Sequence, residues 1–375
     1  MREIGIGIIG WGFMGQTHTY AIKSIPLLYP GIPFVPRLTA VCDYHISEAR
    51  EAALRNGFGF ATDDYRELLR RDDVHVVSVS TPNELHAPMV ADALRAGKHV
   101  YVDKPMTSTL EEARTLLELQ RALHDCPKLQ VVHHNRFFPS SMRARQLIDQ
   151  GALGEILSFR VTYLHSGAVD RSRPAGWKQR AGAGVLLDLG SHALDFILWL
   201  MGPVTAVSAS MRTLYPTRPL PGGGETQELA DDQVIALLRL EGGALGTMEA
   251  SKIATGAADE LKCEIHGSRG ALRWDLMAPD WLEFYDNTLP EEALGGSRGY
   301  VRIECGARFP APGGKFLPPK NTLGWARAHI HCYYSFLEAI AQDRQPSPSL
   351  EEGVCLAKLM RAVELSSQRG GWVDV

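Results

Sequence analysis

The sequence predicts an α/β protein: an N-terminal Rossmann domain with a parallel sheet, followed by an α+β domain built on a large, mainly antiparallel sheet. Three observations predict it. A glycine-rich turn follows the first apolar strand, strand and helix signals alternate up to about residue 137, and strands joined by short turns dominate after it. Alternation is typical of a parallel sheet covered on both faces, whereas hairpins are typical of antiparallel sheets. We therefore expect domains at 1–137 and 138–375.

The first element is a strand that leads directly into a G-x-G-x-x-G turn. Residues 4–9 are apolar and rich in β-branched side chains, and a segment that can continue as helix follows the last glycine. Strand, tight turn and helix in that order are the context of a dinucleotide-binding turn, whose helix N-terminus holds a pyrophosphate. The alternative is an ordinary strand–helix turn. The expected cofactor contacts here are Gly10, Gly12, Phe13, Met14 and Gly15.

The second strand, 37–43, ends in the carboxylate of Asp43. An acidic residue at this place hydrogen-bonds the adenosine ribose and repels a 2′-phosphate, so it favours NAD over NADP. Asp43 lies 28 residues after Gly15, against about 20 in the general pattern. The excess fits in 25–36, whose four prolines predict a surface loop in place of a continuing helix. A subunit or lid contact is the alternative role for this loop.

The remaining elements follow the same two patterns, alternating strands and helices first and mainly strands afterwards. In the first domain we expect strands at 74–80, 99–103 and 129–134, and helices at 87–96 and 110–123. A helix at 143–149 and a long strand at 155–165 begin the second domain. Further strands are expected at 204–213, 233–240, 244–251, 261–266, 271–276 and 281–285, and helices at 326–341 and 350–367. The Gly- and Pro-rich range 286–325 predicts a long loop that serves a site or an interface.

Composition excludes several classes of protein. The chain has 375 residues and a formal net charge of −4, which disfavours a general electrostatic grip on nucleic acid or anionic lipid. Its six cysteines are scattered without a C-x-x-C pair, which favours reduced thiols over a disulfide framework. The first strand leaves no room for a signal peptide, and no apolar run is long enough to span a bilayer. We expect a cytoplasmic protein.

Lys104 is the first candidate for chemistry. It stands in Asp103-Lys104-Pro105, at the carboxyl end of a predicted strand, the edge where doubly wound sheets bind ligands. We expect Lys104 to point toward the nicotinamide half of the cofactor and to stabilise a developing alkoxide as a fixed positive charge. Pro105 sets the turn and is a candidate for a cis peptide bond. The alternative is a surface lysine at a strand end.

The second candidate cluster is the glycine-flanked segment 182–195. If it is helical, Asp188 and His192 stand at i and i+4 on one face, with Asp195 near it. A carboxylate beside an imidazole raises its basicity and orients it, so that His192 could take a proton from a substrate hydroxyl as hydride leaves the carbon. The alternative is an ordinary helix with a capping aspartate and a hydrogen-bonded core histidine.

Together these motifs resemble the Gfo/Idh/MocA oxidoreductases. The resemblance covers nearly the whole chain: G-x-G-x-x-G, then [E/D]-K-P, then G-x-G-x-x-x-D-x-G-x-H-x-x-D. It implies that Lys104, Asp188 and His192 are catalytic, with His192 as the acid/base. The segment 81–86 resembles the family's T-P-N-x-x-H turn beside the cofactor, which implies contacts from Ser80, Thr81, Asn83 and His86. Asp103 stands where the family usually has glutamate and is a further cofactor-contact candidate.

The remaining substrate candidates follow from position. His134 lies in 133–137, where many family members have Tyr-Asn-Tyr-Arg-Phe beside the substrate, so its change bears on which sugar fits. The run 231–251 resembles the sugar and cyclitol dehydrogenase branch. Tyr163, His165 and Trp177 are expected near the substrate, and packing is their alternative role; Trp325 and His329 are candidates to close the pocket. His329 and His331, at i and i+2 on a helix, do not face each other, so we expect no metal.

The sequence thus predicts an NAD-dependent dehydrogenase that oxidises a secondary hydroxyl of a sugar, cyclitol or sugar derivative, with His192 as acid/base. Two alternatives stay open. One is an NAD-retaining epimerase, eliminase or glycoside-cleaving enzyme that uses transient oxidation. The other is a non-catalytic regulator that binds NAD and a sugar. We also expect a homo-oligomer, a dimer or tetramer, formed through the open face of the C-terminal sheet.

Overall fold

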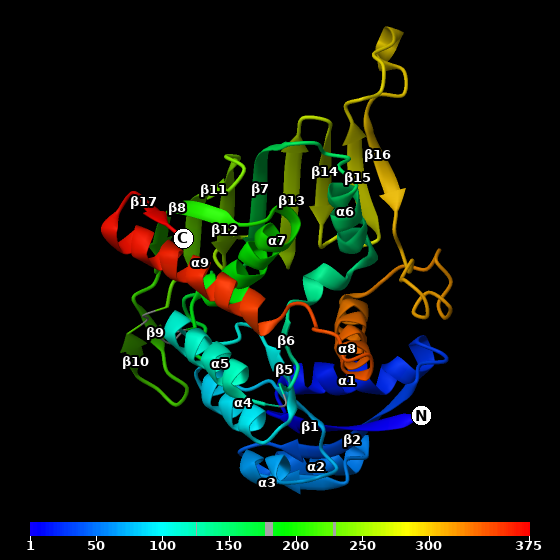
Figure 1. Cartoon of the computed structure of the whole chain (residues 1–375). Helices are drawn as coiled ribbons and strands as arrows, with labels where there is room; N and C mark the ends of the chain where they lie inside the picture. The colour runs from blue at the N-terminus through cyan, green and yellow to red at the C-terminus, as the bar shows by residue number, and fades with distance from the viewer. Residues whose placement is uncertain (125, 177–182, 228–229) are drawn as a thin grey trace. The chain divides into compact units, whose positions relative to one another are not determined.

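The chain divides into two compact units. The computed structural model describes residues 1–124, 126–176, 183–227 and 230–375. The first unit consists of Met1–Phe137 and Arg308–Ala357, and the second unit of Phe138–Ala307 and Lys358–Val375 (Figure 1). The stretch Arg308–Ala357 of the first unit falls within the range 138–375 that the sequence predicts as the second domain.

A six-stranded parallel sheet forms the centre of the first unit. Its strand order is β3-β2-β1-β4-β5-β6, the arrangement of a Rossmann domain, with all neighbours parallel. The fold predicted for the N-terminal part is therefore confirmed. The strands are β1 (Arg2–Ile9), β2 (Phe34–Cys42), β3 (Phe60–Thr62), β4 (Val76–Val79), β5 (His99–Asp103) and β6 (Leu129–Val132).

Helices cover this sheet, and two helices that are far apart in the sequence pack against each other. Helix α1 packs on α8, with Ile22 and Ile25 of α1 and Tyr333 and Leu337 of α8 all in one buried core. Burying each such side chain stabilises the fold by roughly 1.5–3 kcal/mol. The helices are α1 (Phe13–Leu28), α2 (Ile46–Asn56), α3 (Tyr65–Leu69), α4 (His86–Arg95), α5 (Leu110–Ala122) and α8 (Trp325–Ala341), with 3₁₀ turns at Asn83–Leu85 and His134–Phe137.

Helix α1 corrects the prediction of a proline-rich loop at 25–36. It runs through Pro26 to Leu28, and β2 begins at Phe34, so only a short connection separates them. Pro26 lies in the last turn of the helix, and the N–H of Tyr29, the residue after the helix, donates to the Ile25 carbonyl at 2.9 Å. A proline in a helix costs about 3 kcal/mol. Burial of Ile22, Ile25 and Leu28 offsets that cost.

A nine-stranded sheet forms the second unit among the described residues. Its order is β16-β15-β14-β13-β7-β12-β11-β8-β17, and its pairs are antiparallel except the parallel pair β12–β7. This confirms the predicted large, mainly antiparallel sheet. The strands are β7 (Ile156–Leu164), β8 (Val204–Arg212), β11 (Gln233–Leu240), β12 (Leu245–Ser251), β13 (Glu260–Gly267), β14 (Gly270–Asp275), β15 (Trp281–Asp286), β16 (Tyr300–Glu304) and β17 (Trp372–Asp374); β9 (Thr217–Pro219) and β10 (Glu225–Gln227) pair separately.

Helices lie against one face of this sheet (Figure 1). Helix α6 (Pro139–Asp149) contacts β14 and β15, and α7 (Ser191–Met201) contacts β7 and β12. Helix α9 (Leu350–Arg369) contributes its residues from Lys358 onward. Along β11 buried and exposed residues alternate, because successive side chains of a strand point to opposite faces. The sheet therefore has a buried inner face and a second face with exposed side chains.

The range 286–325 does not form the single long loop that the sequence predicts. Its middle forms β16, which pairs with β15 in register from Trp281 opposite Glu304 to Tyr285 opposite Tyr300. Cross-strand contacts stabilise this hairpin: the Arg302 guanidinium lies 4.6 Å from the centroid of the Trp281 ring. The connection at the tip of the β15–β16 hairpin projects from the sheet (Figure 1).

All six cysteines are free thiols, four of them buried and two, Cys126 and Cys355, exposed. Within the part of the chain that is described, no helix has the length and apolar character that a membrane crossing requires.

Candidate active site

The glycine turn after β1 is tightly packed on one side and open on the other. Gly10 has a φ of +94°, a left-handed conformation that favours glycine. A Cβ at Gly15 would lie 2.0 Å from the Gly10 carbonyl oxygen, so only glycine fits there. A Cβ at Gly12, the residue before α1, would meet nothing within 4 Å. The turn thus leaves space in front of a helix N-terminus, which fits a pyrophosphate.

Asp43 stands directly after β2, where the ribose partner is expected. Its Oδ2 accepts a hydrogen bond from the Trp11 N–H at 2.8 Å, and its Oδ1 accepts one from the His45 N–H at 3.0 Å. The carboxylate is therefore held beside the glycine turn. This arrangement of turn and carboxylate fits the adenosine half of NAD.

The segment after β4 connects the glycine turn to the Lys104–Pro105 segment. The Ser80 hydroxyl donates to the Gly10 carbonyl at 2.9 Å. The two ring nitrogens of His86 lie 2.8 Å from the carbonyl oxygens of Pro105 and Thr81. Asn83 begins the 3₁₀ turn between them and is buried. These predicted cofactor contacts are thus brought together by the first unit itself.

Lys104 follows Asp103 at the carboxyl end of β5, and its peptide bond to Pro105 is cis. His134 follows β6, the neighbouring strand. Burial, with the nearby charge of Lys104 as the next cause, lowers the pKa of His134 to about 3. His134 is therefore a neutral imidazole near a lysine at physiological pH.

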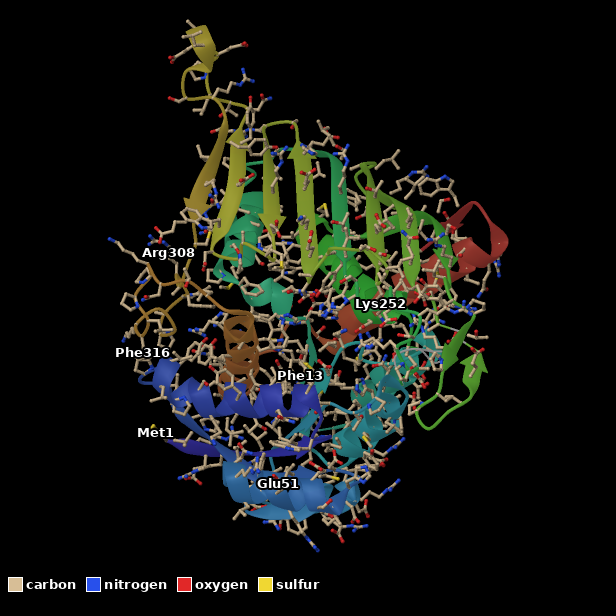
Figure 2. All side chains as sticks on the ribbon, turned by 180° about the vertical axis from the view of Figure 1, so that it is seen from behind. Met1, Phe13, Glu51, Lys252, Arg308 and Phe316 are labelled. Carbon is tan, nitrogen blue, oxygen red and sulfur yellow. The ribbon has the colours of Figure 1, made fainter. Side chains whose placement is uncertain are left out.

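An aromatic cluster links this edge of the sheet to α8. The His134 ring stacks on the His329 ring at a centroid distance of 3.9 Å, and Trp325 lies 4.2 Å from His329. Phe13 of the glycine turn stacks on Trp325 at 5.7 Å and is still 72% exposed (Figure 2). Trp325 and His329, expected near a pocket, thus lie beside the predicted cofactor and substrate residues of the first unit.

In the second unit, Asp188 and His192 lie on an irregular helical segment. Asp188 belongs to a π-helical turn, Leu186–Gly190, and His192 is in the first turn of α7. This corrects the assumption of a uniform α-helix, because a π turn changes the angular offset between residues at i and i+4. π turns occur frequently at functional sites.

Asp231 holds the start of the π turn. Its Oδ2 accepts a hydrogen bond from the Leu186 N–H at 2.7 Å, and its carbonyl oxygen accepts one from the Val185 N–H at 2.8 Å. A Cβ at Gly184 would lie 1.6 Å from Asp231 Oδ1, so glycine is required for this approach. The glycine-rich sequence before Asp188 thus permits close contact with the Asp231 carboxylate.

The side chains around Asp188 form a charged and aromatic group. Nζ of Lys252 lies 3.2 Å from Asp188 Oδ2. The Tyr163 ring lies 5.8 Å from the His192 ring, and the Tyr163 hydroxyl donates to Asp259 at 2.7 Å. Burial, with the nearby carboxylate of Asp259, raises the pKa of Tyr163 well above its usual value. We call these residues the Asp188 cluster: Tyr163, Asp188, His192, Lys252 and Asp259.

His165 and Trp177 are the two remaining residues that the sequence predicts near the substrate. His165 directly follows β7, and its Nδ1 accepts a hydrogen bond from the Gly167 N–H at 2.8 Å, which ties the ring to its own loop. Trp177 lies outside the described residues. No group of three His, Cys, Asp or Glu side chains suited to a metal ion occurs among the residues that are described. His331, which was considered as a metal ligand from the sequence, has its Nδ1 2.8 Å from the Tyr29 hydroxyl.

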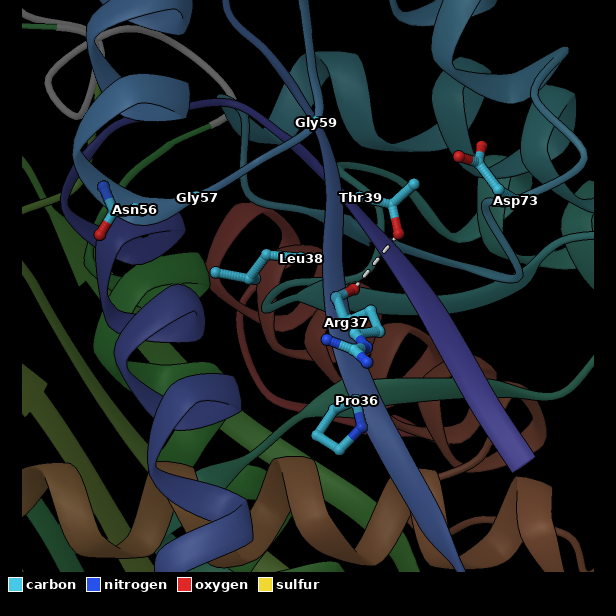
Figure 3. A pocket seen from close by; sticks show the side chains of 8 residues that line it. All are labelled: Pro36, Arg37, Leu38, Thr39, Asn56, Gly57, Gly59 and Asp73. Carbon is cyan, nitrogen blue, oxygen red and sulfur yellow. Dashed lines mark hydrogen bonds between the residues drawn. The ribbon is translucent and has the colours of Figure 1, made fainter. Parts of the chain in front are cut away.

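The first unit also has a surface pocket that other residues line (Figure 3). It is formed by the first half of β2, the connection after α2 and the residue Asp73 before β4. The glycine turn and Asp43 follow the carboxyl ends of β1 and β2, whereas this pocket lies along the earlier part of β2. It contains none of the predicted site residues and is lined by Pro36, Arg37, Leu38, Thr39, Asn56, Gly57, Gly59 and Asp73.

Comparison with known proteins decides the family. An oxidoreductase family model with an NAD-binding Rossmann fold matches residues 4–132, and a GFO/IDH/MocA C-terminal domain model matches residues 141–273. Levoglucosan dehydrogenase of Pseudarthrobacter phenanthrenivorans is 32% identical over 100% of this chain and 99% of that protein. The chain belongs to the Gfo/Idh/MocA oxidoreductase family.

Solved structures agree with this membership. A levoglucosan dehydrogenase in complex with NADH and levoglucosan superposes with a TM-score of 0.93 at 32% identity, covering 100% of this chain and 99% of that one. An oxidoreductase domain protein from Kribbella flavida gives a TM-score of 0.94 at 33% identity over 100% of both chains. The predicted family, Rossmann cofactor domain and NAD are thereby confirmed.

Three residues of this Gfo/Idh/MocA protein that lie around Asp188 were not predicted from the sequence. Lys252 directly follows the run 231–251 that resembles the sugar dehydrogenase branch. A lysine after a strand is usually a solvated surface residue, so nothing in the pattern distinguishes it. Asp231 begins that run, but the resemblance gave it no role, and Asp259 lies in a polar segment without a motif. Their partners, Leu186 and Tyr163, are distant in the sequence, and no local spacing predicts such pairs.

Proposed function

We propose that the protein is an NAD-dependent dehydrogenase that oxidises a secondary hydroxyl of a sugar, cyclitol or sugar derivative. The relatives support this substrate class: complexes of levoglucosan dehydrogenase hold NADH with levoglucosan or L-sorbose, and an inositol 2-dehydrogenase of Rhizobium meliloti is 25% identical over 96% of this chain. The observation that carries the proposal is the retention of Lys104 after β5, and of Asp188 and His192 at the π turn, in a chain with a complete glycine turn.

Each residue has a distinct role in this proposal. Bound NAD supplies the hydride acceptor. His192 takes the proton of the reacting hydroxyl, and Asp188 and Lys104 bind and polarise that hydroxyl. Lys104 stabilises the negative charge that develops on the oxygen. His134, held neutral, offers a hydrogen-bonding imidazole without adding a second positive charge beside Lys104.

A substrate screen with two variants tests this function. Sugars and cyclitols are offered with NAD and, in parallel, NADP, and the absorbance of reduced nicotinamide is followed. We expect NADH formation by the wild type, its loss in Lys104→Ala and in His192→Ala with circular dichroism unchanged, and no loss in the surface control Lys23→Ala. Near-normal turnover by Lys104→Ala would refute the assignment. Product without net NADH would favour the NAD-retaining alternative.

We propose self-association through the exposed face of the nine-stranded sheet. Ile235, Leu237 and Leu245 on β11 and β12 are 49%, 49% and 52% exposed. Apolar side chains gathered on a sheet face are typical of a protein interface. Light scattering should report a dimer or tetramer for the wild type and a smaller species for Leu237→Asp. A monomeric wild type at working concentration would exclude this proposal.

We also propose a cytoplasmic location. The six free thiols are typical of a reducing compartment, because disulfides form and persist mainly in oxidising ones. Cell fractionation with an antibody against the protein tests it, and recovery outside the cytoplasmic fraction would contradict it.

A further inference from the structure

The ion pair between Lys252 and Asp188 lies in a largely buried setting. The two side chains are 11% and 13% exposed, and their charged atoms are 3.2 Å apart. A buried ion pair costs desolvation of both partners, and it becomes strongly coupled because removing one partner leaves an uncompensated charge. The position of the Asp188 carboxylate is therefore sensitive to whether Lys252 is present.

The backbone around Lys252 is fixed from three sides. The Lys252 N–H donates to the Asp232 carbonyl at 2.9 Å, and the Lys252 carbonyl accepts from the Ala168 N–H at 2.9 Å. The preceding carbonyl, that of Ser251, accepts from the His165 N–H at 2.8 Å. Since β12 ends at Ser251, Lys252 is held where a sheet strand meets two neighbouring segments. The Lys252 side chain (Figure 2) thus extends from a backbone position that hydrogen bonds hold in place.

Lys252 also acts on the carboxylate that holds the π turn. Burial raises the pKa of Asp231, and the positive charge of Lys252 is among the influences that work against this rise. Asp231 bonds to the Leu186 N–H at the start of the turn, and Asp188 lies within the turn. The charge of Lys252 therefore acts both on Asp188, within the π turn, and on Asp231, which binds the start of that turn.

We propose that Lys252 is a positioning residue for Asp188: the ion pair holds the Asp188 carboxylate in the orientation that the reacting substrate requires. This inference rests on the proposed dehydrogenase function. Lys252 exerts its effect through Asp188 and does not itself exchange a proton with the substrate.

A double-mutant cycle on turnover tests this proposal. We compare kcat and KM for Lys252→Met, Asp188→Asn and the double variant, using the sugar or cyclitol found in the substrate screen. Lys252→Met should lower kcat by about 100-fold, because the Asp188 carboxylate loses the cation that orients it. Because Lys252 acts through Asp188, the double variant should be no slower than Asp188→Asn alone. Lys252→Arg, which keeps a cation, should recover much of kcat.

Controls separate this role from a general loss of structure. Lys262→Met removes an exposed lysine of the same sheet, whose partner is Glu260, and should leave turnover unchanged. The dissociation constant of NADH, measured by fluorescence, should be the same in Lys252→Met and wild type. If Lys252→Met does not fold, Lys252→Arg and Lys252→Gln carry the comparison, with only Arg expected to retain turnover.

Four outcomes would count against the inference or against the proposals on which it rests, and they can be told apart. Wild-type kcat in Lys252→Met, with Asp188→Asn impaired, would overturn the role of Lys252 alone. Losses that multiply in the double variant would show that Lys252 acts independently of Asp188 and would also overturn it. If the wild type is active and Asp188→Asn is equally active, the proposed role of Asp188 itself is refuted. If the wild type is inactive with every sugar and cyclitol, that result counts against the proposed function.

Discussion

The carboxylate of Asp43 accepts a hydrogen bond from the backbone N–H of Trp11, within the glycine turn, at 2.8 Å. Its second oxygen accepts one from the His45 N–H at 3.0 Å. The residue proposed to bind the adenosine ribose therefore also ties the turn proposed to bind the pyrophosphate. One side chain thus connects the two parts of the site proposed for the adenosine half of NAD.

Asp43→Ala should weaken NAD binding and reduce discrimination against NADP. The change removes acceptors for two backbone N–H groups and a negative charge that opposes a 2′-phosphate. A charge-assisted hydrogen bond contributes roughly 1.5–3 kcal/mol, so the KM for NAD should rise by about 10-fold or more. Kinetics with both cofactors measure it. An unchanged NAD-to-NADP preference would contradict the role of Asp43.

Gly12 and Gly15 should respond differently to alanine. A Cβ at Gly15 would lie 2.0 Å from the Gly10 carbonyl, so Gly15→Ala should destabilise the fold and lower Tm by several degrees. A Cβ at Gly12 meets no protein atom within 4 Å, so Gly12→Ala should keep Tm and lose NAD affinity. Thermal unfolding and cofactor titration separate the two effects. Wild-type affinity in Gly12→Ala would show that the open space does not hold the cofactor.

Tyr163→Phe should lower activity only modestly. The Tyr163 pKa is raised well above its usual value, chiefly by burial and then by Asp259, so the hydroxyl stays protonated and cannot accept the substrate proton. The variant loses one hydrogen bond to Asp259, and kcat/KM should fall by about tenfold or less. The pH–rate profile between pH 6 and 10 should keep its shape. A profile that loses an ionisation would contradict this role.

His18 should contribute to acid sensitivity of the first unit. Burial lowers the pKa of His18 from 6.5 to about 3, so the unfolded chain binds a proton between these values and the folded chain does not. Stability from this group is complete above pH 6.5 and is lost as pH falls toward 3, at about 1.4 kcal/mol per pH unit. Urea unfolding at pH 7 to 4 should show a smaller pH dependence in His18→Gln.

The surface variant His45→Gln is the control for that measurement and should keep the wild-type slope. An equally steep acid destabilisation in His18→Gln would assign the effect to other groups, such as buried His331, whose pKa is lowered to about 3, also by burial.

Local sequence signals predicted the first unit well. The turn Gly10–Gly15, Asp43 and the strands β4, β5 and β6 follow from short-range patterns, because glycine, β-branched residues and strand-end carboxylates act within a few positions. The return of the Arg308–Ala357 stretch to this unit does not follow from such patterns. It depends on α1 and α8 burying their apolar faces against each other.

The candidate site shows the same division. The residue types and order of Lys104, Asp188 and His192 were sufficient to resemble a family, and the comparisons confirm that family. The same residues gave no indication that Asp188 lies in a π turn or that Lys252 pairs with it. Both depend on Asp231 and Lys252, which reach the turn only in the folded chain.

The class of fold, the cofactor turn and the family could be predicted from the sequence, because each motif that indicates them is a short pattern of near neighbours. Tertiary structure decided that α1 continues through Pro26 and that Lys252 pairs with Asp188. The physical reason is burial: core packing offsets the cost of a proline in the last turn of a helix, and desolvation makes a distant cation the partner of a carboxylate.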